Sequence, residues 1–491
     1  MAGRTFWKLG ELPKLLGVRP LPVCRQVDSQ QELSGVSTDS RSLHPGELFV
    51  ALVGDRFDAH DFIPEVVAGG ASAVVVAAGR PELLSLAQRF PGVMFLPVDN
   101  TLQALGRLAR ARLERIRPQV FAVTGSNGKT TTRRMLAGIL ESRFRVHQTA
   151  GNFNNRIGLP LTIFAMPDDC EVAVLEIGMN EPGELGELAA IARPDCLLLT
   201  NVAKAHLEGL GTLEAVARAK CEAIGGVREA GLVVYNIDDP SFRELVPAVA
   251  AGRKAALQLL PVTAFGAADG AGSEPARADE IWLLPEGLSF VFHFAGCRTT
   301  FKLPCWGRHN VMNAALAAAA ACSRSGIAPA AAAAALADFQ PPPGRLQLYR
   351  LAGGGLLVHD AYNANPASMA AALTEVAGRR AGRFLGLVLG DMNELGPESG
   401  PLHREIGRRV AEIRPDLLVL VGRQVKELAH GALDFGLPAN RVFNFPAGAH
   451  EKVCRLLQQR LPENFLLLLK GSRTLQLEKI IDPLLSCFAA A

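Results

Sequence analysis

The residue types that bind a chain of phosphates occur together at positions 124–132, which read T-G-S-N-G-K-T-T-T. Gly125 and Gly128 let backbone N–H groups turn toward phosphate oxygens, and a following helix adds the positive end of its dipole. Lys129 can neutralise phosphate charge, and the hydroxyl of Thr130 can reach a Mg²⁺ ion. An apolar strand-like run precedes the segment and a helical pattern follows it, which is where a phosphate loop lies.

Gly125 and Gly128 are closer together than the glycines of the common pattern G-x-x-x-x-G-K-[ST]. Short glycine turns also join strands to helices for purely structural reasons. The Lys-Thr pair and the flanking elements favour phosphate binding over that alternative. We therefore predict a nucleotide site that also includes Asn127 and Thr131.

Three further residues have side chains suited to metal or phosphate chemistry, each with an ordinary alternative. Glu176 follows a buried strand run, at a sheet edge where a hard cation binds, although a salt-bridged or helix-capping Glu is an equal alternative. His206 comes just after another apolar run, where a lone His most often makes a structural hydrogen bond. Lys220, taken alone, is typical of a solvated helix lysine.

The elements that must position these residues follow from length, composition and apolar runs. At 491 residues the chain is long enough for about three domains. A hydrophobic fraction of 49% with 6% aromatic residues is typical of helices packed on parallel strands, so we expect an α/β fold. We place a small α/β domain at 1–117, a central phosphate-loop domain with a mostly parallel sheet at 118–343, and a Rossmann-like domain at 344–491.

Local patterns divide these domains into strands, helices and loops. The predicted strands are the apolar runs at 49–52, 73–77, 94–98, 120–124, 172–177, 196–201, 231–235, 356–359, 384–389, 417–421, 442–445 and 465–469. Residues 263–279 predict a loop, and the alternation at 281–303 predicts antiparallel strands after it. Two Ala-rich helices are expected on either side of Gly326, with Pro329 in the first turn of the second. The run P-P-P-G at 341–344 ends helical structure and predicts a hinge.

Charge and cysteine usage exclude several classes of protein. Lys plus Arg number 51 against 48 Asp plus Glu, and a net charge of +3 gives no sign of binding to nucleic acid or a membrane surface. The nine cysteines form no CxxC pair or metal-ligand spacing, which indicates thiols in a reducing compartment. The first residues lack an apolar signal segment, and Arg324 interrupts the Ala-rich stretch. We expect a cytoplasmic protein without membrane insertion.

The compact loop T-G-S-N-G-K-T-T-T resembles that of the Mur ligase and folylpolyglutamate synthase superfamily, whose members form amide bonds through acyl phosphates. The segment W-G-R-H-N-V-M-N-A at 306–314 is similar to the superfamily motif G-x-H-N-x-x-N-A, which implies that Asn310 contacts adenine. Arg345 and Asp360 match residues that hold ATP. Without the resemblance, Asn310 or its neighbour would be a helix cap and Arg345 a surface arginine.

The resemblance also gives the metal candidates a common role. In Mur ligases a lysine at the position of Lys220 is carbamylated by CO₂, which turns a cation into an oxygen ligand. Glu176, His206 and carbamylated Lys220 would then bind the second of two Mg²⁺ ions, and Thr130 is the other expected metal ligand. The chain departs from the family at 202–205, V-A-K-A, where a Gly and an acidic residue are more usual.

An N-terminal segment resembles one branch of the superfamily. Residues 37–41, S-T-D-S-R, and 45–52, P-G-E-L-F-V-A-L, are similar to the uridine-nucleotide-binding domain of Mur ligases, which folylpolyglutamate synthases lack. The resemblance implies that Ser40 and Arg41 hold the UDP part of a substrate. Alone, the segment would be a polar turn before a strand.

Motifs farther along the chain narrow the resemblance. Residues 54–62, 151–160 and 389–396 and the motif D-A-Y-N-A-N-P at 360–366 resemble the Mur ligases that join a dipeptide. Ligases earlier in the pathway carry D-x-Y-x-H-x-P instead. The resemblance runs from about residue 35 to residue 473, and it implies that the substrates are ATP, UDP-N-acetylmuramoyl-tripeptide and D-alanyl-D-alanine.

Four asparagines are carried over to the substrates by this resemblance: Asn154, Asn155, Asn363 and Asn365. Asn365 could also cap a helix that begins at Pro366, and the two roles are compatible. A monomer is the expected state.

The implied reaction is attack of the tripeptide carboxylate on the γ-phosphate of ATP, followed by attack of the dipeptide amine on the acyl phosphate. Lys129, Lys220 and His206 are the residues expected to promote it. Arg345 and Asp360 would reach the phosphate loop when the last domain closes and excludes water.

Two rival functions remain open from the sequence. One is the preceding ligase, which adds the third amino acid to UDP-muramoyl-dipeptide, and the asparagines at 363 and 365 argue against it. The other is a nucleotide-binding regulator that keeps the fold without turnover. Intact Lys129, Glu176 and Lys220 argue against that second alternative.

Overall fold

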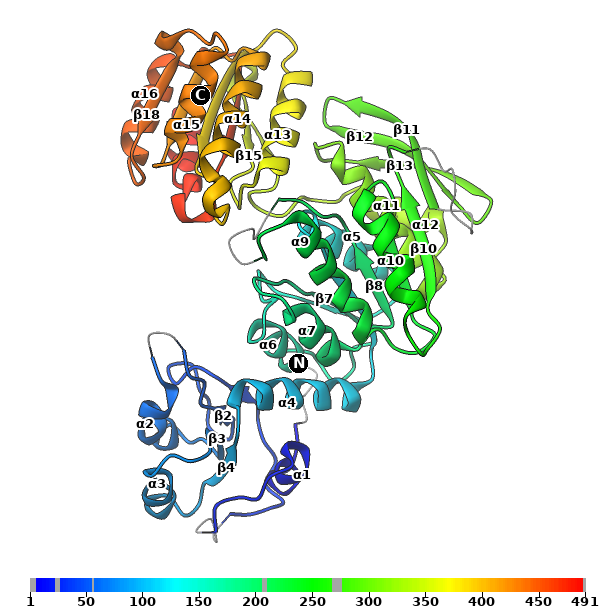
Figure 1. Cartoon of the computed structure of the whole chain (residues 1–491), viewed down its shortest axis with the longest axis vertical. Helices are drawn as coiled ribbons and strands as arrows, with labels where there is room; N and C mark the ends of the chain where they lie inside the picture. The colour runs from blue at the N-terminus through cyan, green and yellow to red at the C-terminus, as the bar shows by residue number, and fades with distance from the viewer. Residues whose placement is uncertain (1–5, 23–26, 55–56, 205–209, 267–275, 489–491) are drawn as a thin grey trace.

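The computed structural model describes residues 6–22, 27–54, 57–204, 210–266 and 276–488. Figure 1 shows three bodies stacked along the long axis, with the N-terminal body at one end and the C-terminal body at the other. Each body contains its own β-sheet. Within the described ranges, no helix is both long enough and apolar enough to cross a membrane.

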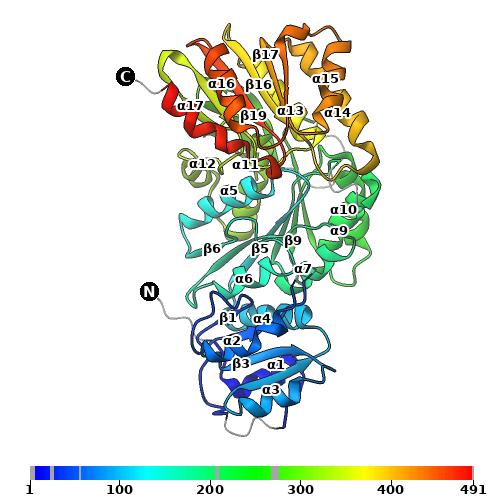
Figure 2. The same ribbon diagram turned by 90° about the vertical axis from the view of Figure 1, so that its left-hand side faces the viewer.

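The N-terminal body has a parallel sheet whose strands lie in chain order. Its elements are β1 (Val36–Ser37), β2 (Leu48–Val50), β3 (Ala73–Ala77), β4 (Met94–Val98), α1 (Leu12–Leu16), α2 (Ile63–Ala68), α3 (Leu83–Arg89) and α4 (Thr101–Ile116). Helix α4 begins where the Asn100 side chain accepts a hydrogen bond from the Gln103 N–H. Figure 2 shows α4 between this sheet and the central body. The buried Arg112 of α4 donates to the Met166 carbonyl at 3.0 Å, which ties the two bodies together.

The central body has a sheet with the order β13-β12-β11-β10-β9-β8-β5-β7-β6. Its strands are β5 (Gln119–Thr124), β6 (Val146–Gln148), β7 (Val172–Glu176), β8 (Cys196–Leu199), β9 (Leu232–Asn236), β10 (Gln258–Thr263), β11 (Ala276–Leu284), β12 (Gly287–Phe294) and β13 (Cys297–Leu303). The strands from β6 to β11 pair in parallel, whereas β12 pairs antiparallel with both of its neighbours.

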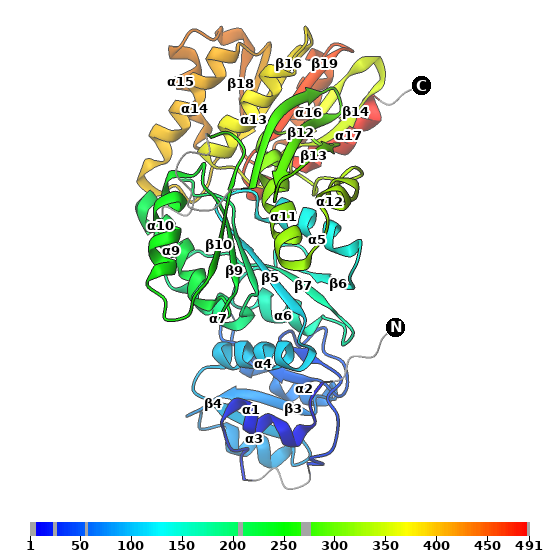
Figure 3. The same cartoon turned by 90° about the vertical axis from the view of Figure 1, so that its right-hand side faces the viewer.

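Helices cover both faces of the central sheet. They are α5 (Lys129–Glu141), α6 (Gly158–Phe164), α7 (Glu184–Ala192), α9 (Leu213–Cys221), α10 (Pro240–Ala251), α11 (His309–Ser325) and α12 (Pro329–Leu336). Figures 2 and 3 show α5, α11 and α12 on one face and α9 and α10 on the other. Two separate clusters of buried apolar side chains fill the layers, because a parallel sheet must be covered on both sides.

The C-terminal body is a six-stranded sheet with the order β14-β15-β19-β16-β17-β18. Its strands are β14 (Gln347–Arg350), β15 (Leu356–His359), β16 (Phe384–Gly390), β17 (Leu417–Val421), β18 (Val442–Phe445) and β19 (Phe465–Lys470). Its helices are α13 (Pro366–Gly378), α14 (Ser399–Ile413), α15 (Val425–Asp434), α16 (His450–Arg460) and α17 (Ile481–Cys487). All strand pairs are parallel except β14 with β15.

The predicted α/β fold with mostly parallel sheets is confirmed, and the long apolar runs became strands within two residues of the predicted ends. The antiparallel strands after the loop are also confirmed, but β11 begins at Ala276, inside the segment predicted as loop. Residues 267–275 lie outside the described part of the chain. The sequence did not predict β1, β6, β10 or β14, which are short or only partly buried and therefore lack a continuous apolar run.

Candidate active site

The phosphate loop leaves β5 and enters α5, as its position in the sequence predicted. Gly128 has a φ of 83°, and a Cβ there would lie 2.4 Å from Asn313 Oδ1. A Cβ on Gly125, whose φ is 148°, would lie 1.9 Å from Thr200 Oγ1. Both positions therefore require glycine, because the backbone is left-handed and a neighbouring polar side chain is already in contact.

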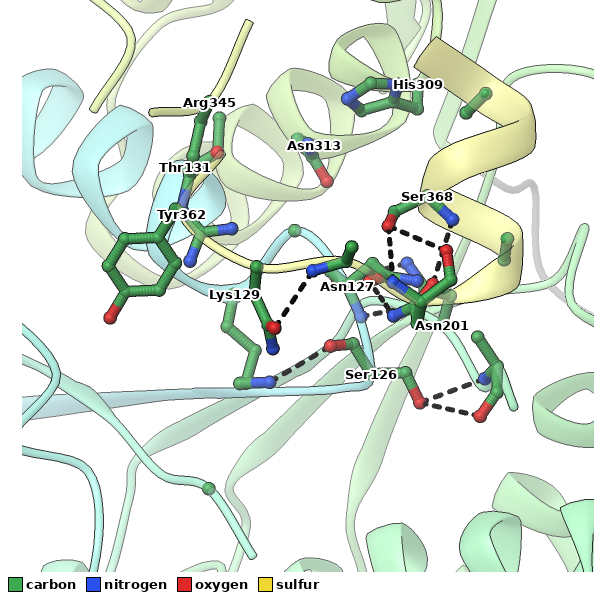
Figure 4. A pocket seen from close by; sticks show the side chains of 18 of the residues that line it. Ser126, Asn127, Lys129, Thr131, Asn201, His309, Asn313, Arg345, Tyr362 and Ser368 are labelled. Atoms are coloured by element: carbon green, nitrogen blue, oxygen red, sulfur yellow. Dashed lines mark hydrogen bonds between the residues drawn. The ribbon is translucent and has the colours of Figure 1, made fainter. Parts of the chain in front are cut away.

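Lys129 bends back along its own loop. Its Nζ donates to the carbonyl oxygens of Gly125 at 2.8 Å and Ser126 at 3.1 Å, as Figure 4 shows for the second contact. Burial lowers the pKa of Lys129, while the nearby carboxylate of Glu176 opposes that shift. These carbonyl oxygens are weak substitutes for an anion, so the ammonium is in position to turn to a phosphate group.

A cavity of about 620 Å³ opens above this loop, between the central and C-terminal bodies. It is lined by loop residues, by residues that follow β7 and β8, by the start of α11 and by the segment that leads into α13. Asn127, Lys129 and Thr131 of the loop line it together with Glu176. The carboxyl ends of β5, β7 and β8 meet at this edge, which is where ligands bind in parallel sheets.

The C-terminal body contacts the phosphate loop directly. Arg345 donates from Nη2 to Thr130 Oγ1 at 3.2 Å, and its guanidinium lies 4.4 Å from the centre of the Tyr362 ring. Asn365 donates from Nδ2 to Asn127 Oδ1 at 2.7 Å. Arg345 and Tyr362 both line the cavity, and Figure 4 shows their side chains beside each other. Of the two residues predicted to reach the loop on closure, Arg345 already contacts it, and Asn365 contacts it as well.

Asp360 lines the same cavity, but its hydrogen-bond partners lie within the C-terminal body. Its Oδ1 accepts from the Leu346 N–H at 3.1 Å, and its Oδ2 pairs with Lys470 Nζ at 2.7 Å. Lys470 also donates to the backbone carbonyl of Asn363 at 3.3 Å. The buried Lys470, from the motif K-G-S-R at 470–473, thus links the predicted residues Asp360 and Asn363.

Glu176 ends β7 with a side chain that is only 2% exposed. Its Oε1 accepts from Asn154 Nδ2 at 2.9 Å, and its Oε2 accepts from Arg133 Nε at 3.4 Å. The salt-bridged alternative considered from the sequence is therefore present in this structure. The neighbouring Asn155 accepts from the Gly158 N–H at 2.8 Å and so helps to start α6. Asn154 and Asn155 both line the cavity.

Lys220 lies in the last turn of α9 and is 2% exposed, so it is not the solvated lysine that its local sequence suggests. Burial and the charge of Lys129 lower the pKa of Lys220 well below its usual value. His206 lies outside the described residues, and in the part of the chain that is described no three His, Cys, Asp or Glu side chains gather as a metal site.

Asn310 is buried in the first turn of α11 and lines the cavity. Its Nδ2 donates to the Trp306 carbonyl at 2.7 Å, and its Oδ1 accepts from Asn313 Nδ2 at 2.9 Å. Asn313 in turn accepts from the Thr132 hydroxyl at 3.2 Å. The helix has no side-chain cap, so the alternative of a capping Asn or His is wrong. The chain of contacts connects α11 to the phosphate loop instead.

Ser40 and Arg41 lie in the N-terminal body and are not among the described residues that line the cavity. The Arg41 side chain is 87% exposed and pairs with Asp39 at 2.7 Å. Its guanidinium holds the pKa of Asp39 down at about 2. Ser40 and Arg41 therefore lie on a different surface from the phosphate loop.

Sequence reasoning missed several residues that shape the cavity. Asn201, just after β8, accepts from the Asn127 N–H at 2.9 Å and donates to the Asn127 carbonyl at 3.1 Å, so it clamps the loop. Arg133 and Asn313 hold Glu176 and the loop helix, as described above. The available signal was a polar residue immediately after an apolar strand, at the edge where β5 also ends.

The fold and the cavity together define a protein that binds a nucleoside triphosphate on a phosphate loop and covers it with a second α/β domain. Three family models match consecutive parts of the chain: "Mur ligase family, catalytic domain" at 32–113, "Mur ligase middle domain" at 123–321 and "Mur ligase, glutamate ligase domain" at 344–473. The chain belongs to the Mur ligase family.

Similar proteins narrow the class further. The chain is 36% identical over 456 residues to the UDP-N-acetylmuramoyl-tripeptide--D-alanyl-D-alanine ligase of Bacillus subtilis, covering 93% of this chain and 94% of that protein. The Escherichia coli protein of the same name is also 36% identical, with 92% and 94% covered. Among solved structures, MurF from Acinetobacter baumannii has a TM-score of 0.85 at 31% identity, covering 99% and 100%. MurF from Thermotoga maritima in complex with ADP has a TM-score of 0.75 at 25% identity, covering 95% and 99%.

Proposed function

We propose that this protein is an ATP-dependent amide ligase that joins D-alanyl-D-alanine to UDP-N-acetylmuramoyl-tripeptide in peptidoglycan precursor synthesis. The observation that carries the proposal is the 36% identity, over almost the whole length, to two proteins that bear that name. The cavity supplies the physical support, because a phosphate loop faces an arginine from the C-terminal body across it.

In the first half of the reaction a terminal carboxylate oxygen of the tripeptide attacks the γ-phosphorus of ATP. The bond between that phosphorus and the β,γ-bridging oxygen breaks, which gives ADP and an acyl phosphate. Lys129 and the loop N–H groups hold the phosphates, and Arg345 adds a forked cation from the other side. The positive charges of Lys129 and Arg345 reduce the repulsion between the attacking carboxylate and the phosphates. The fixed arrangement of the two reactants supplies much of the rate enhancement.

In the second half the amine of D-alanyl-D-alanine attacks the acyl carbon. A tetrahedral intermediate forms, the bond from carbon to the phosphate oxygen breaks, and inorganic phosphate leaves with the amide product. The attacking amine loses a proton in the process. Contacts from Arg345 and Asn365 to the loop keep the C-terminal body over the cavity, where it shields the acyl phosphate from water.

We further propose two Mg²⁺ ions and a carbamate on Lys220. The fit rests on an observation of the chain: Lys220 is a buried amine with a lowered pKa, and an unprotonated amine is the form that reacts with CO₂. The carbamate oxygens, Glu176 and His206 would hold one ion, and Thr130 the other. Bound Mg²⁺ would neutralise charge on the phosphates and the attacking carboxylate.

The remaining assignments concern the substrates and the domains. We propose that residues 1–117 bind the UDP part through Ser40 and Arg41, that 118–343 bind ATP, and that 344–491 close over it. Asn310 contacts adenine and Asp360 holds the nucleotide in this proposal. Asn154, Asn155, Asn363 and Asn365 are then the residues nearest to the peptide substrates, a location supported by their presence on the cavity wall.

We also propose a cytoplasmic monomer. The support is chemical: the eight cysteines in the described part of the chain are all free thiols. Six of these eight are buried, and free thiols persist in a reducing compartment.

A phosphate-release assay tests the proposed function. Purified protein is incubated with ATP, Mg²⁺ and UDP-N-acetylmuramoyl-tripeptide, with and without D-alanyl-D-alanine. A parallel set uses UDP-N-acetylmuramoyl-dipeptide with single amino acids. We expect turnover only where the tripeptide and the dipeptide amine are both present. Turnover only in the parallel set would instead identify the preceding ligase, and silence in both would indicate a nucleotide-binding regulator.

A further inference from the structure

A second contact joins the central and C-terminal bodies, away from the phosphate loop. Arg379, which directly follows α13, and Glu375, one turn earlier, form an ion pair whose side chains are only 7% and 6% exposed. The Arg379 guanidinium also crosses to the turn between β11 and β12. It donates from Nη1 to the Leu284 carbonyl at 2.5 Å and from Nη2 to the Gly287 carbonyl at 2.9 Å. Figures 1 and 3 show this hairpin beside α13.

The surroundings of Arg379 are as specific as its hydrogen bonds. Its guanidinium lies 4.5 Å from the centre of the Trp306 ring, and the indole N–H donates to the Pro285 carbonyl at 3.2 Å. Glu375 accepts from the Arg308 N–H, at the start of α11, at 3.3 Å. We call Arg379, Glu375, Trp306 and the turn 284–287 the Arg379 clasp.

Two features make the clasp rigid. A guanidinium presents its donors in a planar fork, which matches two carbonyl groups and a carboxylate at once in a way that a lysine cannot. The turn that it binds packs closely against β13, because a Cβ on Gly287 would lie 1.9 Å from the Leu303 carbonyl oxygen. The pair is nearly buried, so each charge depends on the other.

The clasp and the phosphate loop hold opposite ends of one helix. Helix α13 has 13 residues, so its ends are about 20 Å apart. At its start, Asn365 donates to Asn127 of the loop at 2.7 Å. Just past its end, Arg379 is held by the hairpin. A rigid helix fixed at two points cannot rotate freely about either, so the far contact restricts where Asn365 and its neighbours can lie.

We propose that Arg379 is a positioning residue for ligation. By binding the β11–β12 turn, Arg379 sets the orientation of the C-terminal body, so that Asn365 and Arg345 contact the phosphate loop. The proposal rests on the proposed function for its kinetic readout. Arg379 is not among the described residues that line the cavity, so it acts through α13 and not on ATP itself.

The test compares Arg379→Met with Arg380→Met. Arg380 is the adjacent arginine, and it pairs with Asp416 and donates to the Arg414 carbonyl inside the C-terminal body. The two exposed cysteines in the described chain, Cys297 of the central body and Cys487 of the C-terminal body, take spin labels in a Cys24→Ser background. Pulsed electron resonance then measures the distance between the bodies with and without ADP.

We expect Arg379→Met to broaden the distance distribution and to raise the KM for ATP about tenfold or more, with a smaller change in the KM for the dipeptide. Arg380→Met should leave both readouts unchanged. If Arg379→Met does not fold, because Glu375 is buried without a partner, the double variant Arg379→Met/Glu375→Met removes both charges and restores folding. That double variant should keep the broadened distribution.

An unchanged distance distribution and an unchanged KM for ATP in a folded Arg379 variant would overturn the proposal. An equal effect of Arg380→Met would also overturn it, because the effect would then be one of general stability. The distance measurement requires only ADP, so it tests the clasp even if the acceptor amine proves to be different. Failure of the proposed function and failure of the clasp are therefore distinguishable.

Discussion

The phosphate end of the cavity and the Ser40–Arg41 turn are built in different ways. At the phosphate end, side chains from distant elements hold one another: Arg345 reaches Thr130, and Asn365 reaches Asn127. In the turn, the Arg41 side chain is 87% exposed and pairs only two residues away. The chain thus organises the ATP half of the reaction before any ligand binds, whereas the turn proposed for the uridine substrate leaves the Arg41 guanidinium exposed.

This difference has consequences for function. Groups that are already fixed act mainly on charge that develops during the reaction, so their loss lowers kcat. A mobile group that orders on binding contributes to substrate affinity and pays side-chain entropy to do so.

Replacement of the buried Lys220 by alanine should reduce ligation by about a thousandfold or more, because the proposed carbamate ligand of a Mg²⁺ ion at the transferring phosphate is lost. The measurement is kcat under saturating substrates. Arg218→Ala is the matched control, since Arg218 lies on the same helix, is 67% exposed and pairs with Glu214. A signal from the carbamate carbon under ¹³CO₂ should be present in the parent protein and absent in Lys220→Ala. Wild-type activity of that variant would contradict the account.

The Arg345→Lys variant keeps the charge but loses the fork that meets Thr130 and the Tyr362 ring. We expect kcat to fall by about a hundredfold, with a change of less than about threefold in the KM for the uridine substrate. Steady-state kinetics with each substrate varied in turn provides the measurement. An effect confined to the KM for the uridine substrate would contradict this contrast. Arg345 would then contribute to substrate affinity, as we expect of the exposed Ser40–Arg41 turn, and not to kcat.

Acid should destabilise the buried part of the molecule and leave the turn unaffected. His403 is fully buried: Nε2 accepts from the Met392 N–H at 3.0 Å and Nδ1 faces the Ser399 carbonyl at 2.7 Å, which requires the neutral ring. Burial lowers the pKa of His403, and it also lowers the pKa values of His309 and His359. Below about pH 6.5 the unfolded chain therefore binds protons that the folded chain does not.

The stability from these histidines is present above pH 6.5 and is lost as the pH falls below it. We expect the free energy of unfolding to be lower by about 1 kcal/mol or more at pH 5.5 than at pH 7.5. Urea denaturation at the two values measures it, and His403→Gln should reduce the difference. A free energy of unfolding that rises toward pH 5.5 would show that the rings are protonated in the folded protein.

The smallest effect is expected for Arg41→Ala. The KM for the uridine substrate should rise about fivefold to tenfold while kcat stays within about twofold, because one exposed hydrogen-bonding cation is lost. Folding should not change, since exposed ion pairs contribute little to stability. Arg19→Ala, another exposed arginine of the N-terminal body, is the control. A hundredfold loss of kcat would show that the turn takes part in the chemistry.

Much of the fold followed from the sequence because long buried strands have continuous apolar runs. Strands β3, β15, β17 and β18 have the predicted ends, whereas β14 was missed because its side chains are mostly half-buried. The phosphate loop was found because its glycines and Lys129 are adjacent in the chain. Functional residues that are adjacent in the sequence can therefore be predicted before the structure is known.

Contacts between segments that are far apart in the sequence could not be predicted in that way. The burial of Lys220 depends on how α9 packs, and only a family resemblance suggested a role for it. Asn201 clamps the loop from another strand, and Arg379 binds a turn that lies more than ninety residues earlier in the chain. No pattern along the sequence predicts such pairs, because they depend on which sheet edges and helix ends meet after folding.

The most direct test of the acyl-phosphate route uses UDP-N-acetylmuramoyl-tripeptide with ¹⁸O in its terminal carboxylate. The protein is incubated with this substrate, ATP, Mg²⁺ and D-alanyl-D-alanine, and the released phosphate is analysed by mass spectrometry. The account predicts one ¹⁸O atom in each phosphate, because the carboxylate oxygen that attacks the γ-phosphorus leaves with it. Unlabelled phosphate alongside amide product would contradict the account, because the carboxylate would then never have been phosphorylated.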